Sequence, residues 1–153
     1  MKSTKYIYKN QLEIICFDKY FSYLNKMLGK MPKMLFDFAN DKSRYELNND
    51  SSLHDAWLTS FVIRKEYLKD VATQVSLDLL LASHEKSLRL IYKKVLNVQC
   101  SFSPDFWPNE PVDLLFHEFS VNEDDSFRHY IQFDRGVRVE LCFMSFEYLT
   151  LSE

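Results

Sequence analysis

The stretch from residue 112 to residue 151, VDLLFHEFSVNEDDSFRHYIQFDRGVRVELCFMSFEYLTL, contains three apolar and aromatic segments separated by two short polar turns. Each segment is rich in the β-branched, aromatic and leucine side chains that fit a pleated, half-buried strand. The first turn is NEDD and the second is DRG, where Gly136 suits the left-handed position of a three-residue hairpin loop. The stretch therefore predicts a three-stranded antiparallel meander.

Further strands are expected before this meander. The segment TQVSLDLLLAS alternates between apolar and polar residues, with one face formed by Val75, Leu77, Leu79 and Leu81. The segments LHDAWLTSFVIRKEYL and LRLIYKKVLNVQCSF are equally apolar, and HEKS is expected to form a hairpin loop before the second of them. The Pro-rich segment SPDFWPNEP predicts a crossing loop that leads to the meander.

Helical spacing begins at Asp18, which is a plausible N-cap. Gly29 suits a helix end and Pro32 suits the first turn of a second helix. The apolar stripes of the two helices are Tyr20, Phe21, Leu24, Met27 and Leu28, followed by Met31, Met34, Leu35, Phe38 and Ala39. The segment before Asp18 is expected to be extended. The sequence thus predicts an α+β fold in which N-terminal helices pack on an antiparallel sheet of about six strands.

The chain is expected to be a single domain over residues 1–153, with a helical part at about 18–47 and a strand part at about 53–151. No apolar leader segment or run of ~20 apolar residues is visible, so a cytoplasmic protein without membrane contact is expected. The three cysteines are widely spaced and form no Cys-x-x-Cys motif. They predict reduced thiols, which agrees with a cytosolic location.

Charge is distributed unevenly along the chain. Residues 1–100 hold 16 Lys+Arg against 11 Asp+Glu, whereas residues 101–153 hold 3 Arg, no Lys and 11 Asp+Glu, a net charge of −8. A surface that follows nucleic-acid phosphates needs the opposite balance, so nucleic-acid binding is not expected. Two interpretations remain open: the carboxylates are simply solvated on strands, or they steer a cationic partner.

Three histidines precede an acidic residue, in His54-Asp55, His84-Glu85 and His117-Glu118. A metal- or ligand-dependent enzyme built on His54, Asp55 and His117 is the alternative function to consider. Adjacent residues of a strand point to opposite faces, so a pair within a strand is poorly placed to share one ion. We therefore expect no metal ligands and no cofactor.

The pair His54-Asp55 is instead expected to satisfy backbone groups where a strand enters the sheet. Trp57, Phe61 and Ile63 share the parity of Asp55 and are expected in the core.

Other catalytic signatures are missing from the sequence. With two glycines in the chain, neither a Gly-x-Ser-x-Gly motif nor a glycine-rich phosphate loop occurs. Cys142 lies within an apolar strand segment, where a thiol usually serves as inert packing. We therefore expect that the protein is not an enzyme.

The segment MPKMLFDFANDKSRYELNNDSSLHDAWLTSF (residues 31–61) and, more loosely, the C-terminal GVRVELCFMSFEYLTL resemble small bacterial proteins. Some of these are similar to immunity proteins, which neutralise polymorphic or contact-dependent-growth-inhibition toxins. The resemblance implies a small, acidic, cytosolic protein that binds a cognate toxin domain stoichiometrically. It brings no catalytic residues with it, and basic nucleases are a frequent toxin class.

A partner-binding surface is expected in the acidic C-terminal third, where aromatic residues stand beside acids in PDFWPNEPVD and SVNEDDSF. The partner is expected to be a toxin domain, bound by a monomer or weak dimer of this chain. The residues predicted to contact it are Asp105, Trp107, Glu110, Asp113, Glu118, Glu123, Asp124 and Asp125.

Overall fold

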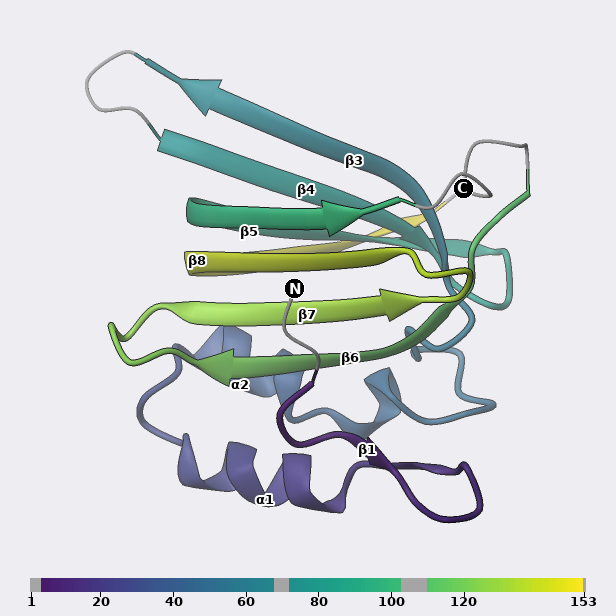
Figure 1. The fold of residues 1–153 in the computed structure, drawn as a ribbon. Coiled ribbons are helices and arrows are strands. Elements are labelled where there is room, and N and C mark those ends of the chain that lie inside the picture. The colour runs from purple at the N-terminus through teal and green to yellow at the C-terminus, as the bar shows by residue number, and fades with distance from the viewer. Residues whose placement is uncertain (1–3, 68–71, 103–109, 153) are drawn as a thin grey trace.

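A six-stranded antiparallel sheet dominates the computed structural model, which describes residues 4–67, 72–102 and 110–152. Its strand order is β3-β4-β5-β8-β7-β6 (Figure 1). The strands are β3 (Trp57–Glu66), β4 (Ala72–Leu80), β5 (Lys86–Ser101), β6 (Leu114–Val121), β7 (Phe127–Phe133) and β8 (Arg138–Ser152). The predicted α+β class is confirmed, and so is the meander, which corresponds to β6, β7 and β8.

The helices come before the six-stranded sheet in the chain but do not begin it, because an extended segment precedes them as predicted. A small hairpin precedes them, in which β1 (Tyr8–Lys9) pairs with β2 (Ile15–Cys16). The side chain of Asn10 shapes its turn by accepting hydrogen bonds from the backbone N–H groups of Leu12 and Ile14, at 2.9 and 3.1 Å. The helical elements that follow are α1 (Asp18–Lys26), α2 (Lys33–Ala39) and the 3-10 turn η1 (Lys42–Arg44).

The sheet is bent so that its two edge strands meet at one end. β5 and β8 are its longest strands, and their pairing shifts register between Val95 and Asn97. Both strands are bent along their length (Figure 1). At the start of β3, the backbone N–H of Asp55 donates to Leu114 at 2.8 Å, and the N–H of Leu114 donates to Ala56 at 2.9 Å. The start of β6 is thereby joined to the start of β3.

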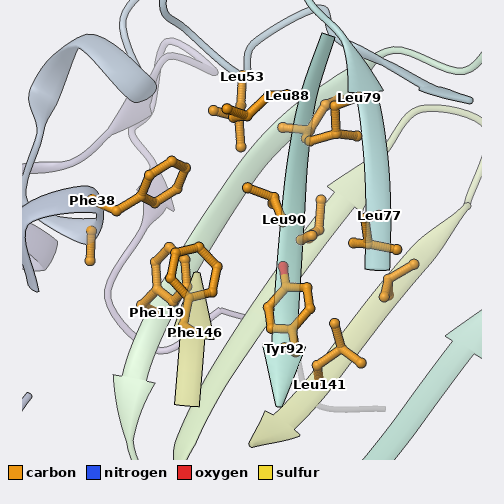
Figure 2. Packing of buried hydrophobic residues seen from close by; sticks show 14 of the residues in the cluster. Phe38, Leu53, Leu77, Leu79, Leu88, Leu90, Tyr92, Phe119, Leu141 and Phe146 are labelled. Atoms are coloured by element: carbon orange, nitrogen blue, oxygen red, sulfur yellow. The ribbon is translucent and has the colours of Figure 1, made fainter. Parts of the chain in front are cut away.

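The core lies between the inner face of this bent sheet and α2. Figure 2 shows Leu77 and Leu79 of β4 beside Leu88 and Leu90 of β5, all of them fully buried. Phe38 of α2 packs against the rings of Phe119, Phe146 and Tyr148, with centroids 6.0, 5.3 and 4.9 Å away. The predicted inward face of β4, from Val75 to Leu81, is confirmed.

Two predicted core residues are wrong. Ile63 is 52% exposed. Trp57 is half-buried outside the core cluster, and its indole N–H donates to Asp113. Phe61 packs against the core as expected. Ile63 keeps the inward parity, because it lies directly opposite the buried Val75 of β4. It is exposed because the far half of β3 extends past the buried core, as the run of exposed residues from Val62 to Glu66 shows.

Candidate functional site

The predicted contact residues fall into two groups at opposite ends of β6. Glu123, Asp124 and Asp125 form the tip of the β6–β7 hairpin, whereas Glu110 and Asp113 precede the strand. The eight residues of β6 separate the groups by about 25 Å at the usual strand rise. Asp105 and Trp107 lie outside the described residues.

The hairpin tip carries the exposed negative charge. Glu123, Asp124 and Asp125 are all exposed, and none of them forms an ion pair with another described residue. Asp124 Oδ1 accepts hydrogen bonds from the N–H and hydroxyl of Ser126, at 3.0 and 2.5 Å. The Ser126 hydroxyl bond lowers the pKa of Asp124. The turn therefore holds the Asp124 carboxylate in a fixed, ionised arrangement.

The two acids before β6 both have partners elsewhere in the protein. Asp113 Oδ1 accepts a hydrogen bond from the indole N–H of Trp57 at 2.8 Å, and the Asp113 backbone N–H donates to Asp134. Glu110 forms an ion pair with Arg135 at 2.7 Å. These carboxylates have internal partners, so this end of β6 offers a weaker negative field than the hairpin tip.

Glu118 is a correction to the predicted surface, because it is fully buried. Its Oε1 accepts the backbone N–H of Lys5 at 2.8 Å, and its Oε2 accepts those of Tyr6 and Ile7 at 2.9 and 2.8 Å. Glu118 therefore anchors the N-terminus and cannot contact a partner.

A hollow of about 650 Å³ lies beside the hairpin on the outer face of the sheet. Its floor contains Arg128, whose Nε donates to Glu140 Oε1 at 2.5 Å and whose Nη1 lies 3.8 Å from Glu118 Oε1. Two carboxylates thus compensate one buried guanidinium. The exposed Glu123 and Asp124 line the rim of the same hollow.

The pair His54-Asp55 lies in a turn before β3, not within the strand. Asp55 has a left-handed backbone with φ 64°, and its Oδ1 lies 3.4 Å from His54 Nε2. His54 Nδ1 lies 3.0 Å from the carbonyl oxygen of Leu115, so it must donate a proton to it. The prediction that the pair satisfies a backbone group at the strand entry is confirmed for His54.

This bond is one of three that cover the free edge of β6. The hydroxyl of Tyr20 accepts the N–H of Phe119 at 3.0 Å, and that of Tyr23 accepts the N–H of Val121 at 2.8 Å. Side chains from α1 and from the turn before β3 thus occupy backbone groups that would otherwise be open to strand pairing.

Replacing His54 with alanine is expected to lower the free energy of unfolding by about 1 kcal/mol, because the Leu115 carbonyl loses its donor. Chemical denaturation of the purified variant measures this change. A matched His84→Asn variant removes an exposed imidazole at a left-handed position, φ 62°, that asparagine tolerates, and controls for the loss of a histidine. Loss of partner binding with an unchanged unfolding midpoint would contradict a stabilising role for His54.

His117 belongs to a buried chain of hydrogen bonds that sequence reasoning missed. Its Nε2 lies 3.2 Å from the carbonyl oxygen of Arg44, and its Nδ1 lies 3.0 Å from His129 Nε2. His129 Nδ1 lies 2.6 Å from the hydroxyl of Tyr92. A carbonyl only accepts, so His117 donates from Nε2, His129 donates to His117, and Tyr92 donates to His129.

Both imidazoles in this chain are held neutral. Burial lowers the pKa of His117 to about 3 and lowers that of His129 well below its ordinary value. Both ring nitrogens of His117 are occupied, so it has no lone pair for a metal shared with His54 and Asp55. Within residues 4–67, 72–102 and 110–152, no group of three or more His, Cys, Asp or Glu could hold a metal ion.

No protein-family model and no curated protein matches this chain. No helix in the described ranges has the length and apolarity needed to cross a membrane.

Proposed function

We propose that this protein is an immunity protein that neutralises a cognate bacterial toxin by stoichiometric binding. The hairpin tip formed by Glu123, Asp124 and Asp125 is the contact surface for a basic toxin domain. The observation that carries the proposal is the exposure of three consecutive carboxylates without an ion-pair partner among the described residues.

Such a tip attracts a cationic protein from a distance. The charges of an internal ion pair largely cancel each other and attract a distant partner weakly, whereas unpaired exposed charges steer association. The fixed turn around Asp124 presents the charges without a large cost for ordering the loop on binding. A nuclease surface that binds phosphates would be complementary to this tip.

Removing charge from the tip is expected to slow association. In a variant carrying Glu123→Lys and Asp125→Asn, the association rate constant with the cognate toxin domain, sought first in the product of the adjacent gene, should fall about tenfold at low salt. Asparagine at residue 125 tolerates the left-handed backbone, φ 64°, of Asp125. Stopped-flow mixing at several salt concentrations measures the rate.

The control is Glu85→Lys, which changes an exposed charge in the β4–β5 loop. It should leave the rate nearly unchanged. An association rate that is insensitive to the tip variant would overturn the surface. Failure of the wild-type protein to bind this toxin domain, or to protect cells that express it, would overturn the immunity function itself.

A further inference from the structure

A second hollow lies on the side of the molecule formed by the β1–β2 hairpin, the segment after η1 and the start of β6. It measures about 660 Å³, and its apolar lining comes from Ile14, Ile15, Phe17, Leu47 and Leu115. His54 forms part of its wall, held by its bond to the Leu115 carbonyl. We call this hollow the apolar groove.

Large apolar side chains remain in water around the apolar groove. Leu47 is 65% exposed and Ile14 is 55% exposed, and both line it. Leu12, in the same hairpin as Ile14, is 78% exposed. Exposed apolar clusters of this kind at a concave site are typical of surfaces that bind another molecule.

The rim of the apolar groove is acidic. Glu13 and Glu46 line it, and the Asp55 carboxylate lies 3.4 Å from the His54 ring that forms its wall. Among the described lysines and arginines, only Lys9 pairs with any of these three acids, at 3.8 Å from Glu13. An apolar floor with a negative rim is complementary to an apolar side chain flanked by lysines or arginines.

We propose that the apolar groove is the anchor site for a basic protein segment, in which one large apolar side chain fills the hollow and flanking cations meet Glu13, Glu46 and Asp55. This inference rests on the proposed function in one respect, namely that the segment belongs to the toxin domain. It adds what the hairpin tip lacks, because the tip is entirely polar and interface affinity is concentrated in buried apolar anchors. Charge at the tip governs the rate of association, and the groove governs the rate of dissociation.

The test uses the full chain and two synthetic peptides. One peptide has a central Leu-Phe-Leu flanked on each side by two lysines, and the other replaces the lysines with glutamates. Titration is followed by NMR at the methyl groups of Ile14 and Leu47 and at the ring of His54. The lysine peptide should shift these signals progressively until they saturate, and the glutamate peptide should bind at least about tenfold more weakly.

Two pairs of variants separate the groove from general effects. Leu47→Ser should raise the Kd of the lysine peptide about tenfold, whereas Leu28→Ser, at a comparably exposed leucine beyond the other end of α1, should not change it. Glu46→Lys should also raise the Kd, whereas Glu66→Lys alters the net charge equally at the exposed far end of β3 and should have little effect.

The proposed role of the apolar groove would be overturned by any one of three results. These are equal binding of the two peptides, NMR shifts located elsewhere, and equal effects of the two variants in a pair. The outcome is distinguishable from failure of the immunity function. Peptide binding at the groove without toxin neutralisation would reject the function alone. Neutralisation with toxin affinity unchanged in Leu47→Ser would reject the groove alone.

Discussion

Replacing Glu118 with glutamine is expected to lower the free energy of unfolding by about 3 kcal/mol, one of the two largest effects expected for this protein. The carboxylate is fully buried and accepts three backbone N–H groups from Lys5, Tyr6 and Ile7. Glutamine has nearly the same shape, but its amide NH₂ would face backbone donors where an oxygen now accepts them. The adjacent Arg128 would lose one of its two carboxylate neighbours.

Chemical denaturation measures the loss, and amide hydrogen exchange locates it. Exchange at Tyr6 and Ile7 should accelerate before the rest of the sheet is affected, because their N–H groups depend on Glu118 for an acceptor. Glu123→Gln, at an exposed position of the hairpin tip, is the matched control and should leave stability and exchange unchanged. A Glu118→Gln protein with wild-type exchange at these amides would show that the anchor is unimportant.

The sheet was predictable because its signals are local. Apolar alternation in β4 and the turn chemistry of the meander each depend on a few neighbouring residues. Gly136, at φ 75°, allows the three-residue loop in which the N–H of Phe133 donates to Val137 at 2.8 Å. These features do not require knowledge of which strand lies beside which.

The errors occur where a local rule is interrupted by one residue. Asp18 begins α1 itself, whose N-cap is Phe17, so the predicted cap is displaced by one position. The left-handed Asp55 converts the expected strand entry into a turn. Single-residue irregularities of this kind carry little signal in composition.

The candidate site was predictable only in part, because burial of a charge is decided by distant segments. Glu118 and Glu123 look alike in sequence, as acids near the end of a strand. Glu118 is buried because Lys5, Tyr6 and Ile7, more than 100 residues away along the chain, donate to it. The apolar groove likewise combines Ile14, Leu47 and Leu115, which no sequence window brings together.

Acidification is expected to destabilise the protein well above the pH at which carboxylates titrate. His117 and His129 are buried and neutral, and each already uses both ring nitrogens for hydrogen bonds. Burial lowers the pKa of His117 from 6.5 to about 3 and that of His129 in the same direction. Below pH 6.5 the unfolded chain therefore binds protons that the folded chain excludes, so stability present above this pH is lost as the pH falls.

Well below pH 6.5, the free energy of unfolding should fall by about 1.4 kcal/mol per pH unit for each histidine, or by about 2.7 kcal/mol per pH unit for both. Urea denaturation between pH 7 and 4.5 measures it. The lowered pKa of Asp124 also makes the folded state less stable in acid. That effect begins near the ordinary carboxyl pKa of 3.8, below the pH range of this measurement.

Variants assign the slope to the buried pair. In His129→Gln, the side-chain oxygen can accept from Tyr92 and the amide can donate to His117, so the chain of hydrogen bonds persists with one titrating group fewer. The slope should fall by about half, whatever the stability at pH 7. His84→Gln changes an exposed imidazole and should keep the wild-type slope. The His129→Gln protein lacks an imidazole that takes up a proton only in the unfolded chain, so its stability must depend less on pH. If this variant keeps the full slope, the acid sensitivity has another origin.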